Sequence, residues 1–393
     1  MTDATTVDSD LAQLQRRALI VGVVAFVLCA VGAAMNPAQF YQSYLVGYLF
    51  WIGIPLGSIG IIMLHHLVGG GWGFIIRRAL ESSMWTLPLM AVLSIPIIIG
   101  MSDLYLWAQP EVVANDEILQ FKAGYLNPSG FIMRLVLYFV IWTGLGYCLS
   151  QWSLEQDRTG DAALTNRLSF ISGPGLPVMA LTITFSVIDW AMSLDPHWFS
   201  TLYGLLFVAG DLLATLAFGV CVVSWLGHKK PLSDFVTTTR IHDLGNLMLA
   251  FVMVWAYFSF SQYLIIWSAN LPEEIPWYIH RTGPGWIAIA VFLLLFHFAL
   301  PFTLLLSRRT KQAASTLMWV AGLVLVMRLV DIYWQVAPAF SKDEIHLHWL
   351  DLAAPIAIGG LWLAAFAWRL KTTALVPLQD PRFADLAKEE HHA

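Results

Sequence analysis

The sequence predicts an all-α protein, a polytopic membrane helix bundle with about ten transmembrane helices. Hydrophobic residues make up 58% of the 393 residues and charged residues only 12%, whereas soluble domains carry about 25% charged residues. The mean hydropathy is +0.68. This composition excludes a water-soluble fold, and the spacing of the apolar and basic residues predicts the architecture.

Each helix that crosses a bilayer needs about 20 mainly apolar residues. The apolar runs are continuous and do not alternate with a period of two, which favours helices over a β-barrel. The predicted spans are 18–36, 43–65, 84–102, 129–150, 172–193, 200–226, 242–268, 284–305, 313–335 and 350–370. They divide the chain into an N-terminal segment (1–17), a transmembrane domain (18–370) and a C-terminal tail (371–393).

The basic residues predict the orientation of the spans. Those in every second gap and in the terminal segments are Arg16, Arg17, Arg77, Arg78, Arg158, Arg167, Lys229, Lys230, Arg240, Arg308, Arg309, Lys311, Arg369, Lys371, Arg382 and Lys388. The remaining gaps hold only Lys122, Arg281 and Lys342, while Arg134 and Arg328 lie inside spans. Positive charge accumulates on the cytoplasmic side of a membrane, so both termini are predicted to be cytoplasmic.

The N-terminal segment argues against a cleaved secretory signal, and the net charge argues against a nucleic-acid-binding protein. Three aspartates precede Arg16 and Arg17, whereas a secretory signal opens with a basic region. The first span is therefore predicted to be a retained helix. The net charge of -5 is spread along the chain without a basic stripe, so we expect membrane lipid around the protein and no nucleic-acid partner.

The sequence lacks the usual ligands of redox centres and nucleotides. Cys29, Cys148 and Cys221 are too far apart for a C-x-x-C pair, so neither an iron–sulfur cluster nor a c-type haem has ligands here. There is also no Walker loop and no H-E-x-x-H motif. A haem held by two histidines would pair His297 with His65 or His66, but a solvated or interface role is predicted for that adjacent pair.

Polar side chains inside the spans mark the candidate site, because each charge at membrane depth costs about 3 kcal/mol or more. The candidates for a polar site or a proton path are Arg134, Asp189, Asp195, His197, Asp211, Gln262, His297, Arg328, Asp331 and Asp351. Most fall in the outer half of the membrane, with Asp211 near its middle and His297 toward the cytoplasm. Together they predict a wet cavity near the outer surface, while no catalytic or metal-ligating residue is assigned.

Several of these residues also have a simpler interpretation. Arg328 and Asp331 lie three residues apart, which suits an intrahelical ion pair. Arg134 can extend its long side chain to the headgroups, and Asp195 can cap or turn the chain before the sixth span. Gln262 lies in a polar run that can pack helices together.

Three strings of the sequence are distinctive: residues 188–204 (IDWAMSLDPHWFSTLYG), 241–246 (IHDLGN) and 267–281 (WSANLPEEIPWYIHR). They resemble the polysulfide-reductase membrane-subunit (NrfD-like) family, most closely its ActF-type members in bacterial alternative complex III, over nearly the whole chain. The resemblance implies two four-helix bundles plus two peripheral helices in the bacterial inner membrane. It also implies a subunit of a quinol:cytochrome c oxidoreductase.

The expected partners follow from the same resemblance. They are a multihaem cytochrome c, an iron–sulfur subunit and a homologous membrane subunit, and quinone or quinol is the one small molecule implied. Two alternatives stay open. The chain is a secondary transporter if its helices are discontinuous near Gly173-Pro174-Gly175 and Gly283-Pro284-Gly285, although helix entry explains both strings. It is a structural scaffold if its buried charges only neutralise one another.

Overall fold

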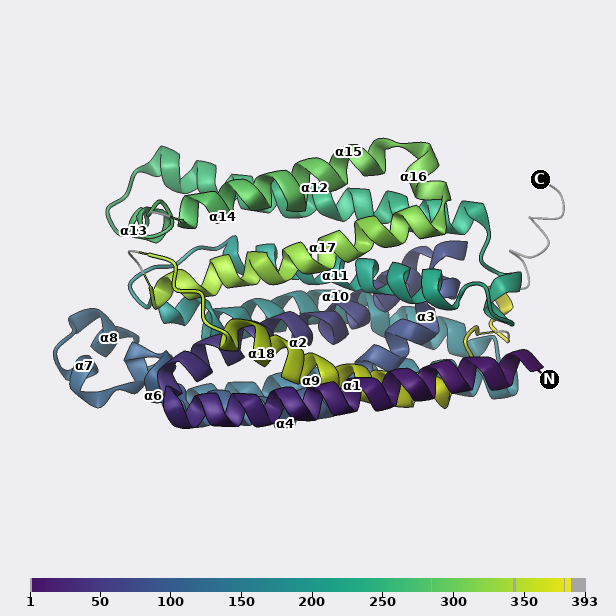
Figure 1. Cartoon of the computed structure of the whole chain (residues 1–393), viewed down its shortest axis with the longest axis horizontal. Coiled ribbons are helices and arrows are strands. Elements are labelled where there is room, and N and C mark those ends of the chain that lie inside the picture. Colours follow the sequence, from purple (N-terminus) through teal and green to yellow (C-terminus); the bar gives the residue numbers. More distant parts are fainter. Residues whose placement is uncertain (1, 284, 342–343, 378, 383–393) are drawn as a thin grey trace.

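The computed structural model describes residues 2–283, 285–341, 344–377 and 379–382, and it confirms an all-α membrane bundle. Within this part of the chain, ten helices or helix runs are long and apolar enough to span a membrane (Figure 1). They are Val7–Met35, Pro37–Val68, Gly71–Ile99, Pro128–Thr159, Ala163–Leu194, Tyr203–Leu226, Thr238–Ala269, Trp286–Leu306, Ala314–Ala339 and Leu350–Lys371. Of the charge pattern, Lys342 and Lys388 lie outside the described residues.

The helices keep the labels of Figure 1. The long ones are α1 (Thr2–Met35), α2 (Pro37–Val68), α3 (Gly71–Met84), α9 (Pro128–Thr159), α10 (Ala163–Trp190), α11 (Tyr203–Leu226), α12 (Thr238–Ala269), α17 (Ala314–Val336) and α18 (Leu350–Lys371). The eighth span consists of α14 (Trp286–Leu293), the π-helical η4 (Leu294–Ala299) and α15 (Leu300–Leu306). Short elements complete the third span, α4 (Leu87–Leu93) and α5 (Ile95–Ile99).

The long helices pack as two groups that meet at α2 and α11. The first bundle comprises α2, the α3–α5 run, α9 and α10, and the second comprises α11, α12, the α14–α15 run and α17. Helices α1 and α18 pack against each other along the side of α2. Close approach there requires glycine, because a Cβ on Gly22 would lie 2.8 Å from the backbone carbon of Gly360. Small residues at such crossings let helix backbones touch.

Several predicted boundaries are wrong. The first span begins at Val7, not at 18, and two other starts differ for identifiable reasons. The third span begins at Gly71, not at 84, because Arg77 and Arg78 made its first turns resemble a loop although both side chains are buried. Helix α10 begins at Ala163 and continues through Pro174, so the first Gly-Pro-Gly string is not a helix entry. The second fits that prediction at Gly285, the N-cap of α14, while Pro284 lies outside the described residues.

The bundle has two distinct ends. One, here called the tail end, brings together both ends of the described chain, since Asp10 pairs with Lys229 and the Lys371 ammonium donates to the Gln15 side chain over 3.1 Å. The other, the loop end, carries α6 (Met101–Leu104), α7 (Pro110–Ala114), α8 (Glu117–Lys122) and α13 (Pro276–Ile279) (Figure 1). Both termini of the described chain therefore lie on one side of the bundle.

Candidate functional site

Three charged side chains meet between α11 and α17 in the second bundle, and we call them the charge triad. Arg328 donates from Nη1 to Asp331 over 2.6 Å and from Nη2 to Asp211 over 2.9 Å. All three are buried, with side-chain exposures of 1%, 1% and 7% for Arg328, Asp331 and Asp211. The predicted intrahelical pair of α17 is confirmed, and the structure adds Asp211, which joins it from α11.

Glycine makes room for the triad. A Cβ on Gly210 of α11 would collide with the Arg328 guanidinium, so the side chain fits only because that position has none. With both carboxylates ionised the triad carries one net negative charge, and all three side chains are buried between α11 and α17. The guanidinium is therefore the group that holds two carboxylates inside the bundle.

His297 and Trp255 extend the triad toward the eighth span. The Trp255 indole N–H donates to Asp331 over 3.2 Å, and its ring meets the His297 imidazole edge-on with 4.2 Å between centroids. His297 lies in the π-helical turn η4 and is fully buried. Neither ring nitrogen has a hydrogen-bond partner among the described residues. Single π-turns are frequent at functional sites because they redirect one side chain out of the helical register.

A large cavity lies beside the triad, between α12, α14 and α17. Its volume is about 650 Å³, and its walls include Trp255, Tyr257, Phe298, Asp331 and Trp334. Tyr257, one of the lining residues, is 65% exposed, so the cavity opens laterally, on the side of the bundle. A mainly apolar cavity of this size with a few polar groups is the usual form of a small-molecule site.

Arg281 is the polar group at the loop end of this cavity. Its guanidinium lies 3.5 Å from the centre of the Trp277 ring, and it donates to the carbonyl oxygens of Trp277, Trp334 and Gln335 over 2.8, 3.2 and 2.7 Å. No carboxylate among the described residues forms an ion pair with it. Burial lowers the pKa of Arg281 to about 10, so the side chain stays cationic at neutral pH and faces the cavity without a counter-ion in contact.

The first bundle holds a separate charged pair near the loop end. Arg134 donates from Nε and Nη2 to the Asp189 carboxylate over 2.9 and 2.8 Å, and the Tyr138 hydroxyl donates to the same carboxylate over 2.8 Å. The Tyr125 ring lies under the guanidinium, with 3.8 Å to its centre. Arg134 also donates to the Tyr125 carbonyl over 2.9 Å, so its guanidinium is held by the Asp189 carboxylate and by the loop that precedes α9.

The other candidates lie apart at the loop end. Asp351 accepts from the Ser43 hydroxyl over 2.6 Å, Gln262 accepts from the Ser200 hydroxyl over 3.1 Å, and His197 pairs with Asp116 over 2.7 Å. The backbone carbonyl of Asp195 accepts from the Trp198 N–H, which agrees with the turn predicted there. Among the ten candidates there are therefore two separate groups, Asp211, His297, Arg328 and Asp331 in the second bundle and Arg134 with Asp189 in the first, and the ten do not line one common cavity.

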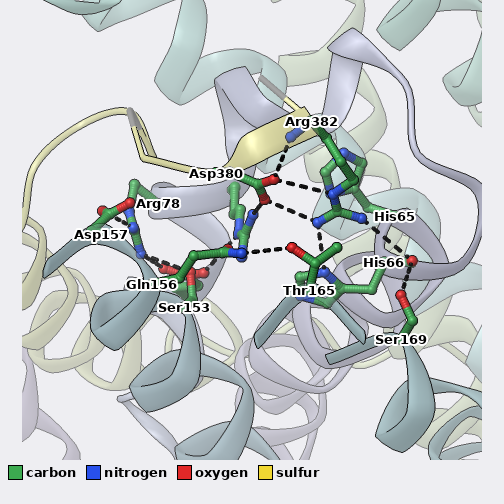
Figure 2. A network of polar contacts seen from close by, with 12 residues as sticks. His65, His66, Arg78, Ser153, Gln156, Asp157, Thr165, Ser169, Asp380 and Arg382 are labelled. Carbon is green, nitrogen blue, oxygen red and sulfur yellow. Dashed lines mark hydrogen bonds and ion pairs between the residues drawn. The ribbon is translucent and has the colours of Figure 1, made fainter. Parts of the chain in front are cut away.

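Sequence reasoning missed a buried ion network at the tail end (Figure 2). Arg77 donates to Asp380 over 2.7 Å and to Glu81 over 3.1 Å. Arg78 pairs with Glu81 and with Asp157. We call these five residues the tail-end network. The spacing of Glu81, three and four residues after the two arginines, is the signal that could have revealed it.

The segment after α18 closes this network. Arg382 donates to the Asp380 carboxylate and approaches the His66 ring nitrogen at 3.4 Å. Although burial opposes ionisation, hydrogen bonds from Arg382 and the charge of Arg77 hold the pKa of Asp380 below its usual range. His65 and His66 are both buried, so of the solvated or interface role predicted for them, the solvated one is wrong. The two histidines lie beside the tail-end network in the first bundle. His297 contacts Trp255 in the second bundle, so it does not face either of them.

Sequence reasoning also missed Arg281, which was counted only as a basic residue of an outer loop. Its signal was local: two aromatic residues, Trp277 and Tyr278, precede it by four and three positions, and their rings pack together at the cavity's edge. Within the described residues no group of histidine, cysteine and acidic side chains is arranged to hold a metal ion. No family model and no curated protein matches the chain.

Proposed function

We propose that this chain is an integral membrane subunit of a quinol:cytochrome c oxidoreductase of the alternative complex III type. In this proposal it binds a quinone-class molecule in the cavity between α12, α14 and α17 and relays protons through the charge triad. The observation that carries the proposal is that one residue belongs to both the cavity and the triad. Asp331 belongs to the triad and also lines the cavity.

The chemistry of the cavity suits a quinone head. Aromatic walls and a lateral opening match a flat ring on a long apolar chain, which would enter from the lipid. Arg281 is a donor without a carboxylate partner and suits a carbonyl oxygen. Asp331 is an acceptor and suits the hydroxyl of the reduced form, whose proton could then pass to a buried carboxylate. In this proposal the electrons leave through partner subunits.

The proposal is tested on the purified complex with a photoreactive quinone analogue. We expect labelling of α12 or α14, competition by unlabelled quinol, and loss of about ten-fold in affinity in Arg281→Leu, because a charged donor is removed. Arg309→Leu, an exposed arginine at the tail end, is the matched control. The same preparations should contain a multihaem cytochrome and an iron–sulfur protein. Unchanged labelling in Arg281→Leu, or recovery of the chain as a stable homo-oligomer alone, would contradict the proposal.

We also propose that the tail end faces the cytoplasm of a bacterial inner membrane, because the basic residues gather there. Reporter domains fused after residue 393 and inserted in the loop 103–127 should report opposite sides of the membrane. The expected pattern is a cytoplasmic signal from the first fusion and an external signal from the second. A shared side for the two reporters would mean that an odd number of the helices between them does not cross the bilayer.

A further inference from the structure

The segment 103–127 forms a protrusion that reaches beyond the other elements at the loop end (Figure 1). Its conformation is fixed by contacts with the bundle. The Tyr105 hydroxyl donates to the Trp190 carbonyl over 3.0 Å, and Asp116 caps α8 while pairing with His197. The protrusion is therefore an ordered part of the fold that presents a defined outer surface.

The outer surface of the protrusion is acidic. Asp103, Glu111 and Glu117 are exposed. Lys122 is the one basic residue in 103–127, and it turns inward, where its ammonium donates to the Pro196 carbonyl over 2.6 Å. Negative charge therefore faces outward with no basic side chain of this segment beside it.

An apolar side chain stands within this acidic surface. Phe121 is 89% exposed, the highest value of any large apolar residue in the described part of the chain. Ile118 lies three residues before it on α8 and is 46% exposed, and Glu117 lies four residues before it. Positions three and four apart share a helix face, so α8 presents an aromatic group, an aliphatic group and a carboxylate together.

We propose that this surface of α8 docks a protein partner that presents an apolar pocket surrounded by lysine and arginine. A central aromatic anchor within a polar rim is the usual arrangement of a binding hot spot, and opposite charge on the partner would steer its approach. A lipid surface fits less well, because anionic headgroups repel carboxylates and hydrocarbon excludes them. This inference rests on the proposed function in one respect: it takes the partner to be another subunit of the proposed oxidoreductase complex.

The test places a photo-cross-linking phenylalanine derivative at position 121 in the full chain, in native membranes. The matched control carries it at Phe170 of α10, which is 82% exposed on a membrane span. We expect position 121 to cross-link to one protein at a peptide rich in lysine or arginine, and position 170 to label lipid. Cross-linking of position 121 to lipid alone, or to this chain alone, would overturn the inference.

Charge reversal separates a docking surface from accidental proximity. Glu111→Lys/Glu117→Lys should lower the yield of that cross-link by about ten-fold, because steering by opposite charge is lost. The exposed Glu155→Lys on α9 is the control and should leave the yield unchanged. An equal yield in the reversed variant would also count against the inference.

The outcomes distinguish the two proposals. If position 121 cross-links to a protein but the preparation contains neither a multihaem cytochrome nor an iron–sulfur protein, the docking surface stands and the proposed function fails. If the complex contains both redox subunits but position 121 reaches neither them nor another protein, the proposed function stands and the docking surface fails.

Discussion

Replacing Arg328 by leucine is expected to destabilise the protein by about 3–5 kcal/mol, because two buried carboxylates lose the charge that holds them. Asp211 and Asp331 both accept hydrogen bonds from this guanidinium. The measurement is denaturant-induced unfolding of the purified protein in detergent, together with its level in membranes. Arg309→Leu, at an exposed position, should change neither. A stability within about 0.5 kcal/mol of the parent, the range of ordinary surface substitutions, would mean that the triad does not hold the helices together.

A series of combined variants separates structure from function at the triad. Arg328→Leu/Asp331→Leu removes the pair on α17 but leaves Asp211 stranded, so stability should return only in part. The triple variant that also carries Asp211→Leu removes every charge and should largely restore assembly. If the restored protein lacks quinol oxidation or its coupling to proton movement, the triad has a functional role. Normal turnover and coupling in the triple variant would establish a purely structural one.

Glu81→Gln should have an effect of similar size at the other end of the molecule. Glu81 accepts from Arg77 and Arg78 at once, and both arginines are only 1% exposed. Loss of its charge leaves two buried guanidinium groups with one carboxylate each, Asp380 and Asp157. We expect a loss of about 3–5 kcal/mol, since breaking a buried network costs more than an exposed pair.

The matched control for this substitution is Glu155→Gln, which makes the same change at an exposed position of α9. Unfolding of both variants is followed in the same detergent, with limited proteolysis after α18 as a second readout. Equal stabilities for the two variants would show that the tail-end network contributes little. A loss confined to Glu81→Gln would assign the stability to this carboxylate.

The spans and one part of the site could be predicted from the sequence because both depend on local spacing. An apolar run of span length predicts a helix wherever it occurs, and Arg328 and Asp331 share a face because they lie three residues apart. Asp211 joins them across 117 positions of the chain. No periodicity relates residues so far apart, so its partner could be found only from how α11 packs against α17.

The remaining differences come from charges that the helices bury. Average hydropathy predicts a loop around Arg77, Arg78 and Glu81, because it counts each charge separately. In the structure these charges are paired, and pairing offsets part of the cost of burying them. The cavity could not be predicted from the sequence either, because its walls come from α12, α14 and α17 and its edge from Arg281.

The polar residues of the seventh span face two different environments. Tyr257 faces the cavity, while Gln262 faces Ser200.

The closure of the tail end has a consequence for the order in which the protein matures. Asp380 pairs with Arg77 across 303 positions of the chain, and the ribosome makes it only after the tenth span. Until then Arg77 depends on Glu81 alone. The first bundle is thus among the earliest parts of the chain to be synthesised, but its ion network is completed only when the segment after α18 has been made. During that interval the buried Arg77 lacks the second of the two carboxylates that it contacts in the finished fold.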